Sequence, residues 1–385
     1  MVSRTYLYTL ILLYCILSYS STFIPITSSL YSVQTNYLII GQGIAGSAMA
    51  LELLSRGKSV VVMSQSGKSY SSDVAAGVYN PINFRKVKYV NHAATAVPLA
   101  ESFYSSAEQI TQLSFHRKSG IIRVFSNEEE RNQWNEFVGN QQADFASSQT
   151  ASEALSAKIK APFGTGIVKG GGVLDTGMYM YAVRNLLQQK NIFRDEWFES
   201  SLCEFTHDGV NYADRIYAER VIFCEGHLGA TNAIHHEIPV TPTKGEVIHV
   251  NIPGLNATEV INGPVYLAPL GNDLYVCGAT FNPGKNDENI SLEGKEELIA
   301  KLQSMIALPF RVESQFAGVR PAGKDRKPLI GVNTMNDRIA YLNGTGSKGV
   351  LYAPMLAKML ADHLIEGAEI PAELNIRRFA KRHRI

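Results

Sequence analysis

The amino-acid sequence predicts an α/β fold joined to an α+β layer of mostly antiparallel strands. The α/β part opens with an apolar run at residues 37–40 that ends in a Gly-x-Gly-x-x-Gly turn at residues 41–46. Apolar residues then recur at helical spacing up to Leu54, and a β-branched run follows at residues 59–63. Strand, glycine turn, helix and strand in this order are typical of a dinucleotide-binding βαβ unit.

Each glycine of this turn has a physical role. Gly41 permits the tight turn, Gly43 lets a pyrophosphate approach the backbone, and Gly46 lets the helix pack close to the strand. The free N–H groups at the positive end of the helix, including those of Ile44 and Ala45, then hold the negative charge.

Length and composition fit an ordinary globular protein. The chain has 385 residues, a formal net charge of +1, a hydrophobic fraction of 45% and a charged fraction of 18%. Two domains and a large core are therefore expected, and a nucleic-acid partner is not. None of the four cysteines lies in a Cys-x-x-Cys pair, so we expect neither a disulfide framework nor a metal site. A reducing, cytoplasmic location follows from the same observation.

The first 35 residues form a hydrophobic leader or anchor. Residues 5–36 carry no charge, and an apolar run begins after Arg4. Three interpretations stay open: a cleaved signal, a membrane contact through residues 6–24, or translated sequence upstream of the true start. The fold itself needs nothing before about Asn36.

A polar loop follows the second strand, which ends at Ser64. The small residues Ala75, Ala76 and Gly77 come next and are followed by an Asn-Pro turn. Such residues suit a backbone that passes close to a flat ligand.

The other elements of the first half are expected to form scaffold. They are a helix at residues 98–113, a strand at 120–125, a helix at 128–138, a strand at 166–169 and a helix at 178–189. Pro98 is expected in the first turn of its helix, where a missing N–H costs nothing. Asp175 or Thr176 is expected to cap the last of these helices.

The second half contains the expected antiparallel layer. Residues 215–226 are expected to form a hairpin-like pair that ends in a strand and Gly226, at the edge where open α/β sheets bind ligands. The layer itself has strands at residues 244–250, 265–269, 274–280 and 310–316, and a helix at 293–306. His235 and His236 fall in a loop between the two parts and are not expected to bind a metal.

Two more motifs lie near the end of the chain. The first is Gly318-Val-Arg320-Pro-x-x-x-Asp325-x-x-Pro328-x-Ile-Gly331. The second, Gly344-x-x-x-x-Gly349-x-x-x-Ala-Pro354, is a glycine-rich loop that opens a helix from about Met355. Its N–H groups can again hold negative charge.

Together these motifs resemble the FAD-dependent D-amino acid oxidase superfamily, in particular its glycine oxidase and sarcosine oxidase branch. The resemblance covers roughly residues 37–380. It implies a Rossmann-type FAD-binding domain, similar to that of glutathione reductase, and a separate substrate domain. The FAD-binding domain is expected at residues 36–80, 166–238 and 317–385, and the substrate domain at 81–165 and 239–316.

The resemblance also implies roles for individual residues. Arg320 is expected to bind the substrate carboxylate. The pyrophosphate is expected at Gly41, Gly43, Ile44, Ala45 and Gly46, and the adenosine part near Ser64 and Gly226. Ala75, Ala76 and Gly77 are expected to line the flavin ring. The closing loop, with Gly344, Gly346, Ser347, Lys348 and Gly349, is expected at the pyrimidine edge of the flavin.

Two positions depart from the family pattern. The second strand usually ends in an acid that bonds the adenosine ribose, and here that residue is Ser64. The closing loop often has a histidine where this chain has Thr345. No histidine matches the family's site of covalent attachment, so we expect FAD to be bound without a covalent link.

The resulting prediction is an FAD-dependent oxidoreductase that oxidises the C–N bond of an amino acid or small amine by hydride transfer. Two enzymatic alternatives are a dehydrogenase of a hydroxy acid or glycerol phosphate and an oxidase of modified tRNA. A non-enzymatic alternative is a flavin-binding protein tethered to a membrane. Tyr266 and Tyr275 are candidates for a hydroxyl in the substrate pocket. The sequence does not indicate an oligomeric state.

Overall fold

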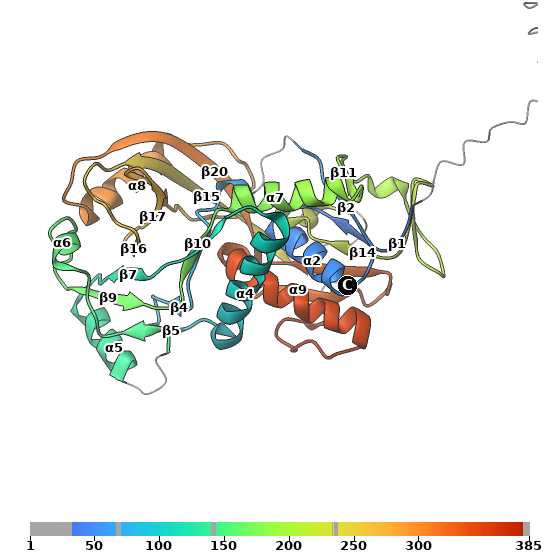
Figure 1. Cartoon of the computed structure of the whole chain (residues 1–385), viewed down its shortest axis with the longest axis horizontal. Helices are drawn as coiled ribbons and strands as arrows, with labels where there is room; N and C mark the ends of the chain where they lie inside the picture. The colour runs from blue at the N-terminus through green and yellow to red at the C-terminus, as the bar shows by residue number, and fades with distance from the viewer. Residues whose placement is uncertain (1–32, 67–70, 140–143, 233, 235–237, 380–385) are drawn as a thin grey trace, which may run out of the picture.

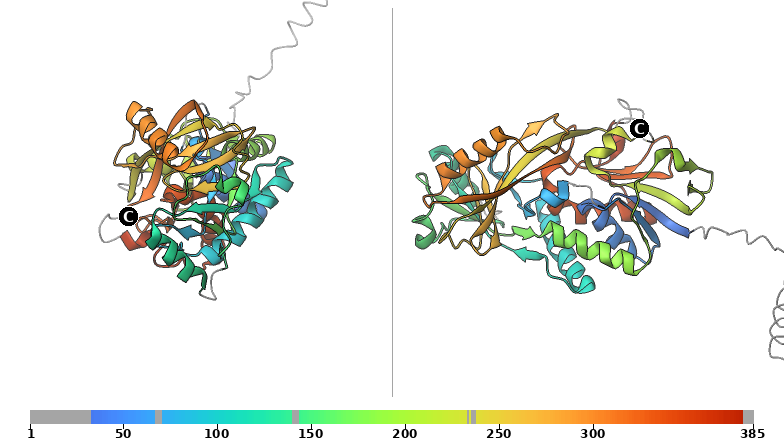
Figure 2. Two further views of the ribbon diagram at one scale, coloured as in Figure 1. Left: turned by 90° about the vertical axis from the view of Figure 1, so that its left-hand side faces the viewer. Right: turned by 90° about the horizontal axis from the view of Figure 1, so that it is seen from above.

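The computed structural model describes residues 33–66, 71–139, 144–232, 234 and 238–379. These residues form two lobes that lie side by side along the long axis of the molecule (Figure 1). Within the described residues, one lobe contains an eight-stranded sheet and the other a nine-stranded sheet. The view from above shows long strands running from one lobe into the other (Figure 2).

The eight-stranded sheet, counted over the described residues, is the predicted Rossmann-type sheet. Its order is β11-β2-β1-β14-β13-β12, with β22 beside β14 and β21 beside β22. The strands are β1 (Val33–Ile40), β2 (Val60–Met63), β11 (Phe193–Arg194), β12 (Cys203–Phe205), β13 (Val210–Tyr212), β14 (Ile216–Phe223), β21 (Leu329–Val332) and β22 (Ile339–Asn343). Strands β11, β2, β1, β14 and β22 are parallel, so their carboxyl ends meet at one edge.

Four helices pack on one face of this sheet. They are α2 (Ile44–Ser55), α4 (Ala93–Thr111), α7 (Thr176–Gln189) and α9 (Gly349–Glu366). Ile39 of β1 faces these helices, whereas its neighbour Leu38 faces a second core on the other side. Because β1 and β2 are buried on both faces, they appear in the sequence as continuous apolar runs.

The nine-stranded sheet, again within the described residues, forms the α+β layer. Every pair in it is antiparallel except β16 with β7. Its strands are β7 (Ile121–Val124), β8 (Ala146–Ser147), β9 (Thr165–Val168), β15 (Val240–Asn251), β16 (Val260–Asn262), β17 (Tyr266–Gly271), β18 (Leu274–Gly278), β19 (Asn282–Pro283) and β20 (Arg311–Gly323). This arrangement confirms the predicted mostly antiparallel layer.

Short elements complete the two lobes. The helices are α3 (Ser71–Val74), α5 (Glu128–Gly139), α6 (Glu153–Ser156) and α8 (Leu292–Met305). The remaining strands are β3 (Val78–Tyr79), β4 (Ile82–Asn83), β5 (Lys88–Tyr89), β6 (His116–Lys118) and β10 (Gly172–Leu174). Asp175 caps α7 by accepting a hydrogen bond from the N–H of Met178, as one of the two predicted caps.

Two helices begin earlier than the sequence predicts. Helix α4 begins at Ala93, so Pro98 lies inside the helix and not in its first turn. Helix α9 begins at Gly349 and contains Pro354, whereas the prediction placed its start near Met355. His92 and Lys348, the residues before these helices, make no side-chain cap, so the sequence carried no start signal.

The sheets divide the chain slightly differently from the expected domain boundaries. Strand β9 belongs to the nine-stranded sheet, although the expected boundary stood at residue 166. Strand β20 continues through residue 317 without a break, because it pairs with β15 from Arg311 to Gly323. The division into two domains at the expected residues stays a prediction.

The predicted leader overlaps the first strand. Val33–Thr35 pair with Ile216–Ala218 of β14, so β1 begins three residues before Asn36. Residues 6–24, like His235 and His236, lie outside the described residues. Among the helices that the structure describes, none is long and apolar enough to cross a membrane.

Candidate FAD and substrate site

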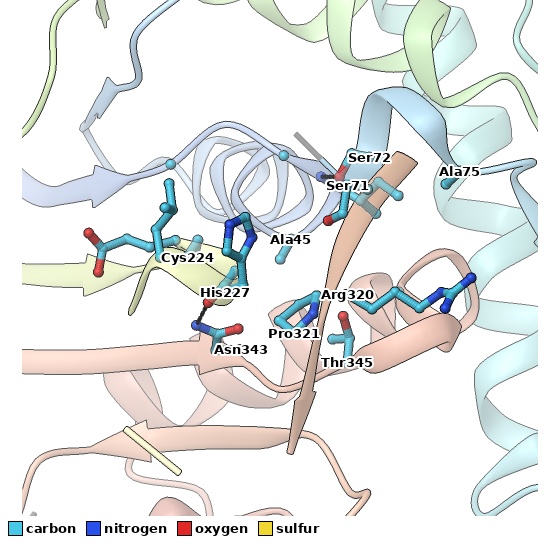
Figure 3. Close-up of a pocket in the computed structure, with 18 of the residues that line it drawn as sticks. Ala45, Ser71, Ser72, Ala75, Cys224, His227, Arg320, Pro321, Asn343 and Thr345 are labelled. Carbon is cyan, nitrogen blue, oxygen red and sulfur yellow. Dashed lines mark hydrogen bonds between the residues drawn. The ribbon is translucent and has the colours of Figure 1, made fainter. Parts of the chain in front are cut away.

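A large cavity lies between the two lobes, at the carboxyl edge of the parallel strands. The ends of β1, β2 and β14 form its floor, and α3 and the closing loop after β22 form its sides. Strands β15 and β20 of the other sheet also line it, and Figure 3 shows β20 crossing the cavity with Arg320 and Pro321. The cavity therefore lies where open α/β sheets bind ligands.

The glycine turn forms a cradle at the centre of the floor. A Cβ atom on Gly41 would lie 2.6 Å from the carbonyl oxygen of Cys224, and one on Gly46 would lie 1.9 Å from the carbonyl oxygen of Gly41. Gly46 does not line the cavity, because its role is to seat α2 against β1. Gly43, Ile44 and Ala45 do line it.

Helix α3 lies beside the start of α2, as Figure 3 shows. The N–H of Ile44 donates a hydrogen bond of 3.3 Å to the hydroxyl of Ser72. Ser71 and Ser72 both line the cavity. They add hydroxyl groups at the point where a pyrophosphate meets the helix N-terminus, and sequence reasoning did not single them out.

The small residues after α3 allow a close approach of the backbone. Ala75, Ala76 and Gly77 line the cavity. Gly77 has a φ of +68°, and a Cβ there would lie 1.7 Å from the carbonyl oxygen of Leu174. The hydroxyl of Thr176 donates to the carbonyl oxygen of Ala75, which ties this segment to the start of α7.

The closing loop forms the opposite side. Gly346, Ser347 and Gly349 line the cavity, whereas Gly344 and Lys348 do not. Gly344 instead packs against Leu329. Burial lowers the pKa of Lys348 to about 8, so this amine is partly neutral at weakly alkaline pH.

Gly226 lies just after the carboxyl end of β14, close to the closing loop. Its carbonyl oxygen accepts a hydrogen bond of 2.9 Å from Asn343, the last residue of β22. Because β14 and β2 flank β1 on opposite sides, Gly226 and Ser64 stand at different ends of the floor. The expected contact of Gly226 with the adenosine part of the cofactor stays a prediction.

Arg320 projects from β20 into the cavity, away from His227 and Asn343 (Figure 3). Its Nη1 donates a hydrogen bond of 3.3 Å to the carbonyl oxygen of Thr280. Burial lowers the pKa of Arg320, and the charge interaction with Tyr266 raises it by a smaller amount. The guanidinium stays charged, because even a lowered arginine pKa lies far above neutrality. Among the described residues, no carboxylate forms an ion pair with it.

Gly245 and Tyr266 surround the guanidinium. A Cβ on Gly245 would lie 2.1 Å from Nη2 of Arg320. The guanidinium therefore fits only because residue 245 has no side chain. Tyr266 lines the cavity, and burial raises the pKa of its hydroxyl. Tyr275 does not line it, because its hydroxyl contacts the backbone of Ala257.

Several lining residues were not found by sequence reasoning. They are Gln42, Ser71, Ser72, Glu196, Trp197, Glu225, His227 and Gly245. Gln42, Glu225 and His227 lie within or beside the recognised motifs, but their residue types follow no pattern that marks a ligand contact. Glu196 and Trp197 lie far from any motif in the sequence. Among the described residues, no cluster of histidine, cysteine and acidic side chains could hold a metal ion.

The fold and the cavity define a dinucleotide-binding protein of the Rossmann type. The cradle leaves no room for a side chain at two glycines, and the N-terminus of α2 lies at the cavity, because Gly43, Ile44 and Ala45 line it. The cavity then continues past the small residues to a buried, unpaired cation. These features fit a pyrophosphate at one point and a flat ring beside an anionic substrate at another.

Residues 36–363 match the family of FAD dependent oxidoreductases, and the chain belongs to that family. The resemblance seen in the sequence is thereby confirmed, and the cofactor of the family is FAD. This match rejects the non-enzymatic interpretation. The individual cofactor contacts named above stay predictions.

Three relatives illustrate the similarity. Glycine oxidase of Bacillus licheniformis is 35% identical over 127 residues, which are 32% of this chain and 34% of that protein. The tRNA 5-methylaminomethyl-2-thiouridine biosynthesis bifunctional protein MnmC of Marinobacter nauticus is 24% identical over 379 residues, 88% of this chain and 56% of that protein. The crystal structure of glycine oxidase from Bacillus cereus superimposes with a TM-score of 0.72 at 21% identity, covering 88% of this chain and 96% of that chain.

These similarities differ in what they establish. The chain spans about one third to just over one half of the length of the two curated relatives. The structural similarity at 21% identity shows the fold.

Proposed function

We propose that this FAD-dependent oxidoreductase oxidises the C–N bond of a small amino acid or amine that carries a carboxylate. The observation that carries the proposal is Arg320, a buried cation that faces the cavity without a carboxylate partner in the described chain. Removing a charge from water costs free energy, which a bound anion offsets. Glycine oxidases among the sequence and structural relatives support the same substrate class.

Bound FAD supplies the electron acceptor for a hydride from the substrate carbon. The residues of the protein position the substrate. Arg320 grips the carboxylate through two parallel N–H donors, which fixes both the distance and the angle of the substrate. Tyr266 is placed to donate its hydroxyl to the same carboxylate. These contacts with the carboxylate hold the reacting carbon of the substrate in one position relative to the flavin.

The walls of the cavity near Arg320 exclude water. Val78 and Val247 line it there with apolar side chains. The acidic lining residues are Glu196 and Glu225, and neither influences the pKa of Arg320. We therefore assign no carboxylate base to the Arg320 end of the cavity, and the substrate amine is proposed to react in its neutral form.

The absorption spectrum of the purified chain tests the cofactor, and anaerobic bleaching of its flavin bands tests the substrate class. We expect bleaching by small amino acids or N-substituted glycines, and none by glycerol phosphate or hydroxy acids. Bleaching by hydroxy acids alone would overturn the proposal. Arg320→Ala should raise the substrate concentration for half-bleaching by at least about 100-fold, because a buried charged hydrogen bond is lost, while the flavin stays bound.

A second candidate comes from MnmC, a relative that aligns with most of this chain. The alignment with MnmC covers 88% of the chain, far more than that with the Bacillus licheniformis glycine oxidase. An aminomethyl group on tRNA is therefore an alternative substrate. The formal net charge of +1 argues against it, since tRNA binding needs a basic surface. Bleaching by modified tRNA and not by free amino acids would favour this candidate.

A further inference from the structure

The end of β2 lacks the acid that would bond the adenosine ribose. Ser64 lines the cavity there and is 6% exposed, and its neutral hydroxyl gives no charge assistance. The N–H of Ser64 donates to the carbonyl oxygen of Arg194, the last residue of β11. Because β11 and β2 are parallel, the segment after β11 emerges beside Ser64.

That segment contains two acids with different positions. Asp195 accepts a hydrogen bond of 2.6 Å from the N–H of Ser66, so it closes the turn between the two strand ends. Glu196 lines the cavity instead. Its Oε2 accepts a hydrogen bond of 2.9 Å from Arg215, which holds the carboxylate in place. Within the described residues, Oε1 of Glu196 accepts no hydrogen bond, so it can accept one from a ligand.

Two aromatic residues follow Glu196. Phe198 is buried and stacks on Tyr212, with ring centroids 5.2 Å apart. Trp197 also lines the cavity, yet 41% of its surface is exposed. Phe198 thus anchors the segment in the core, and the indole of Trp197 presents an aromatic surface to the ligand space.

We propose that Glu196 and Trp197 form the adenosine subsite of the bound FAD. The carboxylate of Glu196 accepts hydrogen bonds from the ribose hydroxyls, in place of the acid that is absent at Ser64. The indole of Trp197 stacks on the adenine. This assignment rests on the family's cofactor and on the cavity, and not on the identity of the substrate.

The other acidic lining residue lies in the wrong place for this role. Glu225 follows β14, on the far side of β1 from β2. Both of its oxygens accept hydrogen bonds from Asn232. The closing loop, expected at the flavin ring, also lies on that side, beside β22. Adenosine therefore extends over β2 and β11, where Glu196 and Trp197 stand.

Release of FAD from the full-length flavoprotein tests the subsite without measuring activity. The rise in flavin fluorescence after dilution gives the release rate. Trp197→Ala should speed release by roughly 10-fold or more, the loss of one base–aromatic stack. Trp197→Phe keeps an aromatic ring and should stay within about 3-fold of the native rate. Equal rates in native protein and Trp197→Ala would overturn the role of Trp197.

The ribose contact is tested in the same assay. Glu196→Gln should speed FAD release by roughly 10-fold, because the bond loses its charge assistance. Glu204→Gln, an exposed carboxylate on β12 outside the cavity, is the matched control and should change nothing. Arg215→Gln breaks the ion pair and leaves the carboxylate. An effect of Arg215→Gln as large as that of Glu196→Gln would show a structural role and overturn the assignment.

Ligand titrations of the deflavinated chain separate the two ends of the cofactor. ADP should quench the fluorescence of Trp197, and Trp197→Phe should abolish that quenching. The other tryptophan, Trp134, is buried in the second lobe and donates to the carbonyl oxygen of Ser147. FMN lacks adenosine, so its affinity should be unchanged by Trp197→Ala and Glu196→Gln. Equal losses for FMN and ADP would overturn the proposal.

Discussion

At the scale of single residues, the substrate end of the cavity depends on one cation and the space left for it. Arg320 is buried, and its guanidinium lies against Gly245 on the neighbouring strand. A planar guanidinium offers two parallel donors to a carboxylate, whereas an ammonium group is a point charge. A substitution at position 320 can therefore keep the positive charge of the side chain and remove its planar, two-donor shape.

Arg320→Lys keeps the charge and removes the two-donor geometry. We expect kcat/KM for a carboxylate substrate to fall by about 100-fold, because the substrate is no longer held at one angle. Steady-state kinetics with a carboxylate substrate and with its amide measure this. The amide should lose much less. An equal loss for both would show that Arg320 does not contact the carboxylate.

Gly245→Ala tests the space beside the guanidinium. The added Cβ would lie 2.1 Å from Nη2 of Arg320, and a flexible side chain gives way before the sheet does. We expect KM to rise about 10-fold, with the flavin spectrum and the melting temperature nearly unchanged. A large drop in melting temperature would mean that the strand moves, and would contradict this prediction.

At the scale of elements, proline inside a helix explains an unusual contact. Pro354 of α9 has no N–H, so the carbonyl oxygen of Val350, four residues earlier, loses its helical partner. The hydroxyl of Tyr104 on α4 donates to that oxygen at 2.7 Å. Both residues are buried. Helix α4 thus supplies the hydrogen bond that α9 cannot make for itself.

Tyr104→Phe should therefore destabilise the protein by about 1–3 kcal/mol, because it leaves a buried carbonyl group without a partner. In the Pro354→Ala background the restored N–H satisfies Val350, and the cost of Tyr104→Phe should fall below about 1 kcal/mol. Denaturant unfolding of the four proteins measures the cycle. An equal cost in both backgrounds would show that the two residues act independently.

The helices and strands also show which parts of the fold could be predicted from the sequence alone. The βαβ unit was predicted because continuous apolar runs, glycine spacing and helical periodicity all lie within residues 37–63. The starts of α4 and α9 were missed, since proline normally ends a helix and the compensating donor, Tyr104, is 246 residues from its acceptor. Contacts between segments far apart in the sequence leave no local pattern.

The same reasoning applies to the cavity. Glycines and small residues that must let a ligand approach were recognisable from the sequence, and most of them line the cavity. Ser71, Ser72 and Trp197 were not recognisable, because their place depends on how α3 and β11 meet the ends of β1 and β2. Lys348 stood in a motif, yet its side chain lies outside the cavity lining.

At the scale of the whole molecule, a buried acid links stability to pH. Burial raises the pKa of Glu225 to about 7 from an ordinary value of 4.5. The folded protein therefore holds this proton more tightly than the unfolded chain does. The contribution of Glu225 to stability is complete below pH 4.5 and is lost as the pH rises through 7.

Glu225→Gln keeps the shape of the side chain and stays neutral at every pH. Relative to the native protein, the variant should gain stability between pH 4.5 and 8, by up to roughly 3 kcal/mol at ~1.4 kcal/mol per pKa unit. Denaturant unfolding across this range, at constant excess FAD, measures the difference. A difference that does not change with pH would show that burial does not raise the pKa of Glu225.

The continuity of β20 has a consequence for recombination between relatives. The strand carries Arg320 near its C-terminal end, packs Gly318 against α3, and pairs Ala322 with Thr345 of the closing loop. A domain exchange with its crossover at residue 317 would join two half-strands of different ancestry. Crossovers before Val240 and after Gly323 would transfer β15 and β20 intact. The recombined protein should then have the substrate preference of the relative that supplies β20, the strand that pairs with the closing loop.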